Sequence, residues 1–148
     1  MDFTDIYNTS NKVTSCGFLI KDTNTGKFLA CHPTGNKNNL YDIPKGKMEA
    51  NEDYLSCAIR ELKEETGIAL TGNEDIQDLG HFNYRPEKDL HLFKLELPIQ
   101  LETLICTSMF TDSNGVSKPE MDGFELVDSA DKYFYSLQPI IKRCLRSY

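Results

Sequence analysis

Residues 44–68 read PKGKMEANEDYLSCAIRELKEETGI and contain the strongest helix signal in the chain. The second half of this stretch predicts an amphipathic helix over residues 51–66. Four apolar residues recur at the helical period and form one stripe: Leu55, Ala58, Ile59 and Leu62. We expect Asn51 to cap the N-terminus of this helix, and Gly67 to end it in the left-handed conformation.

The polar edge of this predicted helix carries Glu61, Glu64 and Glu65, at positions i, i+3 and i+4. Like charges at this spacing repel one another, at a cost of roughly 0.2–0.5 kcal/mol per pair. A divalent cation reverses the sign of that interaction, and Mg²⁺ and Mn²⁺ prefer oxygen ligands. Because glutamates are also common on solvated helix faces, these three residues alone leave both interpretations open.

The residues before the helix favour a metal–phosphate site. Gly46 has no side chain, so its backbone can approach a ligand closely. Lys45 and Lys47 flank it with positive charge in a chain whose net charge is −7. A glycine loop, a helix start and a carboxylate cluster together indicate binding of metal and phosphate.

The rest of the chain predicts a mixed α/β domain that spans residues 1–148. Strands are predicted at residues 13–20, 27–32, 76–84, 90–97 and 124–127, the first two joined as a hairpin. Residues 101–110 fit a strand or a helix, and residues 111–123 have the composition of a loop. Residues 128–148 predict a terminal helix, begun by Asp128 or Ser129 and kinked or split at Pro139. Regular βαβ alternation is absent from this order.

Composition excludes several classes of function. The net charge of −7 argues against broad binding to nucleic acid or anionic membranes. The N-terminal sequence lacks the pattern of a signal peptide, and no apolar run reaches the length of a membrane span. Five cysteines in no paired or zinc-like spacing predict free thiols, with a catalytic cysteine as the minor alternative. We therefore expect a cytoplasmic protein.

Gly46, Glu52 and the run RELKEETGI at residues 60–68 resemble the signature of the Nudix hydrolase family at every specified position. The resemblance in motif covers residues 44–68, and the order of elements around it is more loosely similar. It implies a Nudix α/β/α sandwich with a mixed central sheet, a catalytic loop–helix at about residues 44–67 and a C-terminal helix. It also implies metal-assisted hydrolysis of a nucleoside diphosphate linked to another group.

The resemblance further implies a set of site residues. Mg²⁺ or Mn²⁺ would be held by six residues: Gly46 through its carbonyl, Glu52, Glu61, Glu64, Glu65 and Glu120. Arg60 would orient a glutamate through charge-assisted hydrogen bonds. The catalytic group comprises Arg60, Glu61, Glu64 and Glu120, and the general base is left open among the three glutamates. Asp122 and Glu125 are alternatives to Glu120 for the acidic residue outside the signature.

The substrate is implied only as a class. YDIPKGKMEANED at residues 41–53 resembles the opening found in dinucleoside polyphosphate, diphosphoinositol and mRNA-decapping members, with Tyr41 in place of a tryptophan. Tyr84 stands where dinucleoside polyphosphate hydrolases carry a base-stacking tyrosine, and Lys45 and Arg85 could contact phosphate. We expect a small nucleotide substrate, either a dinucleoside polyphosphate or an ADP-ribose-like compound.

The sequence is also compatible with other functions. Within the enzyme class they are cleavage of oxidised nucleoside triphosphates and hydrolysis of RNA caps, although the acidic charge makes nucleic acid an unfavourable partner. Outside that class, a nucleotide-binding sensor could keep the fold without turnover. The oligomeric state, monomer or homodimer, is also open.

Overall fold

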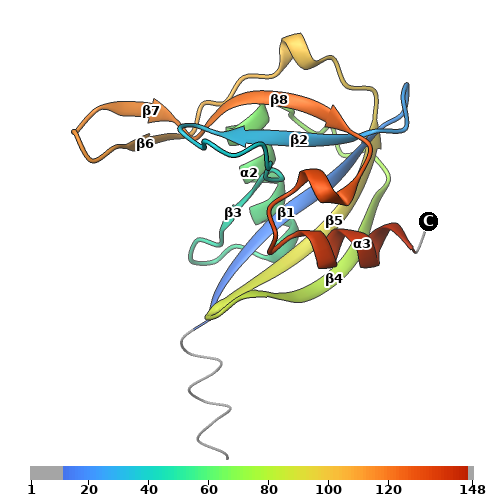
Figure 1. Ribbon diagram of the computed structural model, residues 1–148. Helices are drawn as coiled ribbons and strands as arrows, with labels where there is room; N and C mark the ends of the chain where they lie inside the picture. The colour runs from blue at the N-terminus through green and yellow to red at the C-terminus, as the bar shows by residue number, and fades with distance from the viewer. Residues whose placement is uncertain (1–11, 147–148) are drawn as a thin grey trace, which may run out of the picture.

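The computed structural model describes residues 12–146 and is built on a mixed six-stranded sheet (Figure 1). The strands are β1 (Val13–Asp22), β2 (Phe28–Pro33), β3 (Lys45–Lys47), β4 (Ile76–Arg85), β5 (Lys88–Leu97) and β8 (Met121–Val127). Their order is β4-β5-β1-β2-β8, with β3 paired to β1. The β1–β5 pair is parallel and the other pairs are antiparallel.

One helix covers each face of the sheet. The buried face of α2 (Tyr54–Thr66) joins a core cluster with Cys16, Phe18 and Ile20 of β1. Leu19, the intervening residue, joins the other cluster, which contains residues of α3 (Gln138–Leu145). Successive side chains of a strand point to opposite faces, so β1 contributes to both cores. The predicted Nudix α/β/α sandwich with a mixed sheet is confirmed.

The two strands of the predicted hairpin separate soon after their turn. β1 and β2 pair at Lys21 and Phe28. Farther along, Asp42 exchanges backbone hydrogen bonds with Cys31 of β2, at 2.8 Å each way, while Gly46 pairs with Cys16 of β1. The segment that ends in β3 is thus inserted between the two strands. This insertion places Gly46 against the middle of the sheet, close to α2.

The N-cap of α2 is Asp53, so the expectation of Asn51 was wrong. The Asp53 carboxylate accepts a hydrogen bond from the Ser56 backbone N–H at 2.7 Å, which satisfies one of the unpaired donors of the first turn. Asn51 lies outside the helix with a φ of 69°. Gly67 ends the helix in the left-handed conformation, with a φ of 80°, as predicted.

The predicted loop over residues 111–123 is largely a β-hairpin, a second correction. Strands β6 (Met109–Thr111) and β7 (Ser117–Pro119) pair in antiparallel register, and β8 already begins at Met121. Asp112 stabilises the turn between β6 and β7. Its carboxylate accepts hydrogen bonds from the backbone N–H groups of Asn114 and Val116, both at 2.9 Å. Residues 101–110, which fitted either a strand or a helix, contain one 3₁₀ turn, η1 (Leu101–Thr103). The last two of these residues belong to β6.

The C-terminal segment is divided, but the break precedes Pro139, whereas the sequence predicted it at the proline. A 3₁₀ turn, η2 (Ala130–Lys132), follows Ser129, whose hydroxyl accepts the Asp131 backbone N–H at 3.2 Å. The α-helix α3 begins only at Gln138 and carries Pro139 in its first turn, where a missing N–H removes no helical hydrogen bond. The last two residues of the predicted helix lie outside the described residues, as does most of the N-terminal sequence judged for a signal peptide.

All five cysteines are free thiols, as predicted, and four of them are buried. Among residues 12–146, no helix is long and apolar enough to cross a bilayer.

Candidate active site

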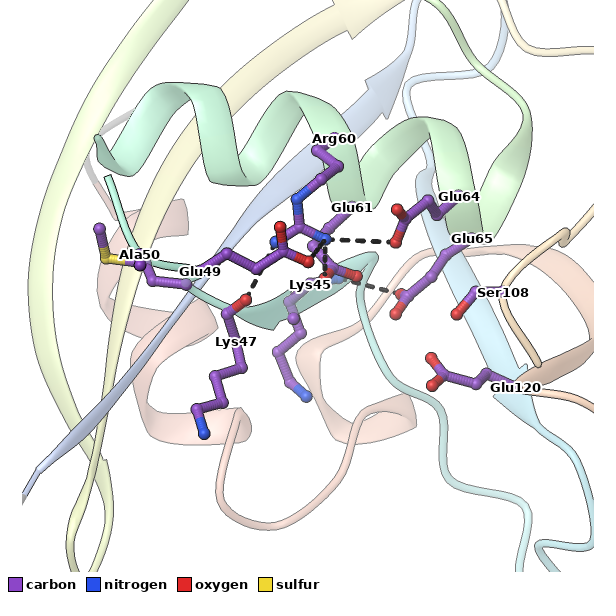
Figure 2. A pocket seen from close by; sticks show the side chains of 12 residues that line it. Lys45, Lys47, Glu49, Ala50, Arg60, Glu61, Glu64, Glu65, Ser108 and Glu120 are labelled. Atoms are coloured by element: carbon purple, nitrogen blue, oxygen red, sulfur yellow. Dashed lines mark hydrogen bonds and ion pairs between the residues drawn. The ribbon is translucent and has the colours of Figure 1, made fainter. Parts of the chain in front are cut away.

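A pocket of about 660 Å³ lies where β3 and its following loop meet α2 and the start of the β6–β7 hairpin (Figure 2). Its acidic lining comes from three separate places in the sequence: Glu49, the α2 residues Glu61, Glu64 and Glu65, and Glu120. Lys45, Lys47 and Arg60 also line it, together with Ser108. The pocket thus gathers most of the residues that the sequence predicted to act together.

Gly46 is required at its position because the Glu61 side chain occupies the space that a larger residue would fill. A Cβ built on Gly46 would overlap the Glu61 carboxylate, and that carboxylate belongs to a residue only 7% exposed. The Gly46 carbonyl accepts a hydrogen bond from the Cys57 thiol, at 3.4 Å between Sγ and O. The structure therefore gives the glycine a steric role, and its role as a metal ligand stays a prediction.

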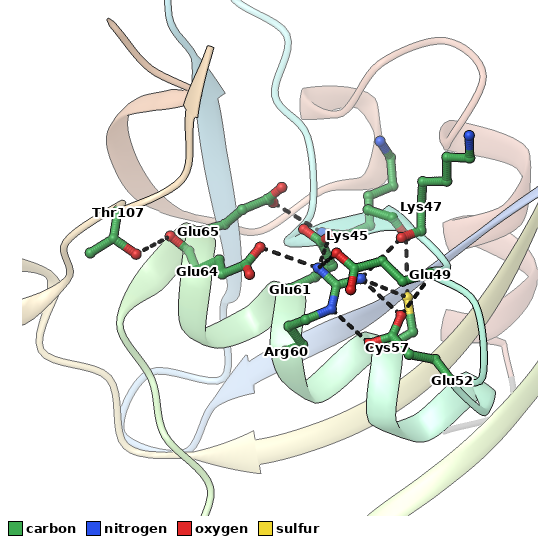
Figure 3. Close-up of polar contacts among 11 residues, drawn as sticks. Lys45, Lys47, Glu49, Glu52, Cys57, Arg60, Glu61, Glu64, Glu65 and Thr107 are labelled. Carbon is green, nitrogen blue, oxygen red and sulfur yellow. Dashed lines mark hydrogen bonds and ion pairs between the residues drawn. The ribbon is translucent and has the colours of Figure 1, made fainter. Parts of the chain in front are cut away.

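Arg60 is the centre of the polar network beside the pocket (Figure 3). Its Nε and Nη2 atoms donate to the two carboxylate oxygens of Glu52, at 2.6 and 2.9 Å. Nη1 donates to Glu61 at 2.8 Å and to Glu64 at 3.3 Å, and Nη2 also donates to the Lys47 carbonyl at 3.0 Å. A guanidinium fork suits this multidentate arrangement, which a lysine could not reproduce. Arg60 thus links the glycine loop to the acidic edge of α2.

Glu52 is placed as a support for Arg60, and its role at the metal site stays a prediction. Both of its carboxylate oxygens are held by Arg60, and one also accepts the Glu49 backbone N–H at 2.8 Å. The hydrogen bonds from Arg60, followed by that backbone bond, lower the pKa of Glu52 to about 2. Its side chain is absent from the pocket lining.

Burial makes two of the pocket carboxylates costly to ionise. Glu65 is 2% exposed, and its desolvation raises the pKa to about 9, although the Lys45 backbone N–H donates to it at 3.1 Å. Burial is also the main cause that raises the pKa of Glu61, against the opposing effect of Arg60, and the charges of Glu64 and Glu120 add to the rise. A nearby cation favours the ionised form of such groups.

The donor set of the pocket fits a hard divalent ion. Its carboxylates are the ligands that Mg²⁺ and Mn²⁺ prefer, and the missing side chain at Gly46 leaves room for Glu61 between loop and helix. Within residues 12–146, however, no three acidic, histidine or cysteine side chains already converge on one point as metal ligands would. Arg60 accounts for part of this, because it holds oxygens of both Glu61 and Glu64.

The segment before β6 is attached to the C-terminal end of α2. The Glu64 carbonyl accepts the backbone N–H groups of Thr107 and Ser108, at 2.7 and 3.1 Å, and the Thr66 carbonyl accepts that of Ile105 at 3.0 Å. These bonds satisfy carbonyls that the helix leaves free at its end. They bring Ser108 to the pocket, and the Glu120 backbone N–H in turn donates to the Ser108 carbonyl at 2.8 Å. Sequence reasoning missed Ser108, since nothing in its local pattern signals this long-range contact.

The sequence predicted substrate contacts for Lys45, Tyr84 and Arg85, but these three residues do not all lie at the carboxylate pocket. The Lys45 ammonium lies 3.1 Å from the Asp42 carboxylate and 5.4 Å from the centre of the Tyr84 ring. Tyr84 is 8% exposed and belongs to the core cluster on the α3 face. Arg85 lies over that ring at 4.8 Å and lines a separate hollow of about 380 Å³. The structure brings Lys45 to the carboxylate pocket but not Tyr84 or Arg85.

The remaining candidates lie beside β2 and β8. The Tyr41 hydroxyl donates to Glu125 at 2.8 Å, and His32 contacts Asp122. Tyr41, Asp122 and Glu125 are absent from the pocket lining, whereas Glu120 is part of it. Of the three acidic candidates outside the signature, the structure therefore places only Glu120 with the α2 glutamates (Figure 2).

Comparison with known proteins decides the family. Residues 12–131 match the profile of the NUDIX domain, which is most of the chain. The chain belongs to the Nudix family. It is 33% identical to an uncharacterized 17.7 kDa protein in the e-segB intergenic region of Enterobacteria phage T4, an alignment that covers 92% of this chain and 95% of the phage protein. With its fold and its signature, the protein is a Nudix hydrolase.

Two further relatives show how far the likeness of this Nudix hydrolase extends. The mRNA-decapping protein g5R of African swine fever virus is 54% identical over 48 residues, which are 32% of this chain and only 18% of g5R. The structure of the Escherichia coli dihydroneopterin triphosphate pyrophosphohydrolase superposes with a TM-score of 0.68 at 17% identity, covering 91% of this chain and 96% of that one. The latter likeness concerns the fold alone.

Proposed function

We propose that this Nudix hydrolase cleaves the diphosphate linkage of a small nucleotide, either a dinucleoside polyphosphate or an ADP-ribose-like compound, in a reaction that depends on Mg²⁺ or Mn²⁺. The observation that carries the proposal is the meeting of Glu61, Glu64 and Glu65 of α2 with Glu120 in one pocket. Two of these acids, Glu61 and Glu65, are buried, and their burial raises the pKa of each. A divalent ion beside a diphosphate would favour their charged forms.

The proposed ligands are Glu61, Glu64, Glu65 and Glu120, with the Gly46 carbonyl as a further candidate. When bound, a divalent ion would neutralise the charge of the diphosphate and polarise the attacking water. Arg60 holds the loop and helix in register, so that Glu61 and Glu64 keep their positions at the pocket wall. Lys45 and Lys47 offset part of the acidic charge that a phosphate would otherwise meet.

We assign the general base to Glu120, with Glu64 as the alternative. Glu120 reaches the pocket from the end of the β6–β7 hairpin, on the side away from Arg60 (Figure 2). In the pocket, the Arg60 guanidinium donates hydrogen bonds to Glu61 and to Glu64. A base must be free to accept a proton from water, and this favours the residue that Arg60 does not hold.

Hydrolysis of RNA caps is the second candidate. It is supported by the local identity to g5R, a protein named for mRNA decapping. Against it stand the net charge of −7 and the fact that the chain spans 18% of the length of g5R. A small nucleotide requires no extended basic surface, whereas RNA does. We therefore place the small nucleotide first.

The test is a panel of substrates incubated with purified protein and Mg²⁺, with products resolved by ion-exchange chromatography. The panel contains diadenosine tetraphosphate, ADP-ribose, an oxidised nucleoside triphosphate and a capped oligoribonucleotide. We expect Mg²⁺-dependent cleavage of one of the first two at the highest kcat/KM, and its loss in EDTA. Binding of nucleotides without cleavage of any panel member would contradict the proposal and favour the sensor.

Replacement of the acids separates their roles. Glu120→Gln is expected to lower kcat more strongly than it weakens metal binding, because Glu120 is both a proposed ligand and the proposed base, whereas Glu64→Gln should mainly weaken metal binding. Glu49→Gln is the matched control, because Glu49 lines the same pocket but its side chain is 67% exposed and contacts Arg60 only at 3.6 Å. Normal turnover in both Glu120→Gln and Glu64→Gln would remove the assignment.

A further inference from the structure

The pocket provides for a diphosphate but not for a base. Among the described residues that line it, none is aromatic. The two aromatic residues expected to stack on a base do not reach it: Tyr84 is in the core, and Tyr41 is bonded to Glu125. A nucleotide whose phosphates lie against the acids must therefore place its base on a neighbouring surface.

The β6–β7 hairpin projects from the body of the fold (Figure 1), and the residues at its base, Ser108 and Glu120, line the pocket. In its register, Met109 faces Pro119, Phe110 faces Lys118 and Thr111 faces Ser117. Immediately beyond this ladder lie Ser108, before β6, and Glu120, after β7. The Glu120 backbone N–H donates to the Ser108 carbonyl at 2.8 Å, and both residues line the pocket.

Residues two apart on a strand share a face. The face that carries Ser108 and Glu120 therefore continues into Phe110 and Lys118, whereas Met109 lies on the opposite face.

Phe110 is the aromatic group available on this face. It is exposed over 36% of its surface, although large apolar side chains are usually buried. Its cross-strand neighbour Lys118 is engaged by Asp112, at 3.0 Å between Nζ and Oδ2. Much of the lysine charge is thereby offset, so the ring is the principal feature that this surface presents to a ligand.

We propose that Phe110 forms the base-binding subsite of this enzyme, stacking on the heteroaromatic base of a nucleotide whose diphosphate lies in the carboxylate pocket. The inference rests on the proposed function, since it takes the ligand to be a nucleotide. Phe110 lies about 7 Å along the strand from Ser108, at two residues of strand rise. A ribose separates base from phosphate by a comparable length, so one nucleotide can span both surfaces.

The competing explanation is that the hairpin contacts a second copy of the chain. Met109 and Val116 are also exposed, over 52% and 50% of their surfaces. A contact of that kind would involve both faces of the hairpin and would not depend on nucleotide. The subsite involves only the face that continues the pocket, so Met109 and Phe110 form a matched pair for the experiment.

The sequence contains no tryptophan, which makes a fluorescence test specific. In Phe110→Trp the single indole replaces the proposed stacking group, and in Met109→Trp it lies on the opposite face. Each variant is titrated in Mg²⁺ with the methylene-bridged analogues of ADP-ribose and diadenosine tetraphosphate, which resist cleavage at the bridge. We expect saturable quenching in Phe110→Trp and none in Met109→Trp. Equal quenching in both, or none in either, would overturn the subsite.

Kinetics provides the second measurement. Phe110→Ala should raise KM by about 5- to 100-fold, the range produced by loss of one base–aromatic stack, with little change in kcat. Met109→Ala should leave KM unchanged. A concentration-dependent dimer that both alanine variants abolish, with KM unaltered, would assign the hairpin to self-association and overturn the proposal.

The outcomes for the reaction and for the subsite can be told apart. Cleavage by the wild-type protein with no selective quenching would leave the hydrolase assignment intact and remove only the subsite. Selective quenching in a protein that cleaves nothing would support the subsite and remove the proposed reaction.

Discussion

The α-carbon of Gly46 packs directly against the carboxylate of Glu61, so that a methyl group at position 46 would overlap it. This contact joins β3 to the middle of α2. We expect Gly46→Ala to displace Glu61 and to lower kcat/KM by about 100-fold, because a displacement of about 1 Å at a catalytic group has that effect. Steady-state kinetics measures the loss.

The matched control is Gly123→Ala. Gly123 lies in β8, and a Cβ there would meet the His32 Cβ at 3.7 Å, an ordinary van der Waals distance. Its variant should retain nearly full activity. Equal activity of the two glycine variants would show that the Glu61 position is not critical.

Arg60→Lys tests the network that holds the acidic residues. A lysine keeps the charge but cannot donate to Glu52, Glu61 and the Lys47 carbonyl together, as the guanidinium does. Loss of such an orienting partner typically costs about 10- to 100-fold in activity or metal affinity. We expect a loss of that size in kcat, measured together with Mn²⁺ affinity. Wild-type kinetics in Arg60→Lys would mean that charge alone suffices.

The buried acid Glu65 predicts how stability depends on pH in metal-free protein. Its pKa rises from 4.5 to about 9 on folding, chiefly because of desolvation. Between these values the folded protein holds a proton that the unfolded chain has released, so the free energy of unfolding falls as pH rises from about 5 to 9. Urea unfolding in EDTA across this range measures the slope. Glu65→Gln should flatten it, and an unchanged slope would contradict the burial of Glu65.

Tyr84→Ala tests whether this residue belongs to the core or to the substrate site. Because Tyr84 is 8% exposed within a core cluster, truncation should lower the free energy of unfolding by about 3 kcal/mol. Tyr84→Phe, which retains the ring, is the control and should be close to wild type. An alanine variant of normal stability with a raised KM would instead support the base-stacking role expected from the sequence.

Much of this site could be predicted from local sequence because its parts lie on one short segment. The apolar stripe fixes which face of α2 is buried, and this places Glu61, Glu64 and Glu65 together at its edge. Glycine is required at position 46 because of Glu61, a residue of the same segment 44–68. The predicted start of the helix was wrong, because the N-cap is Asp53 and not Asn51.

The remaining features depend on contacts between distant segments. Ser108 reaches the pocket because its backbone N–H caps a carbonyl of α2, and no side-chain pattern encodes that bond. The β6–β7 hairpin has short strands and a polar turn, so its composition is that of a loop. Tyr84 stands at a spacing typical of a stacking residue, but tertiary packing buries it. Spacing along the chain does not determine which side of a strand meets the core.

An anomalous difference map would show whether α2 and Glu120 hold a divalent ion for cleavage of a diphosphate. Crystals of the protein would be soaked with Mn²⁺ and a methylene-bridged nucleotide, and diffraction recorded where manganese scatters anomalously. We expect a peak within bonding distance of the carboxylates of Glu61, Glu64 and Glu65. A map with the nucleotide bound but no manganese among these carboxylates would contradict the proposed metal site.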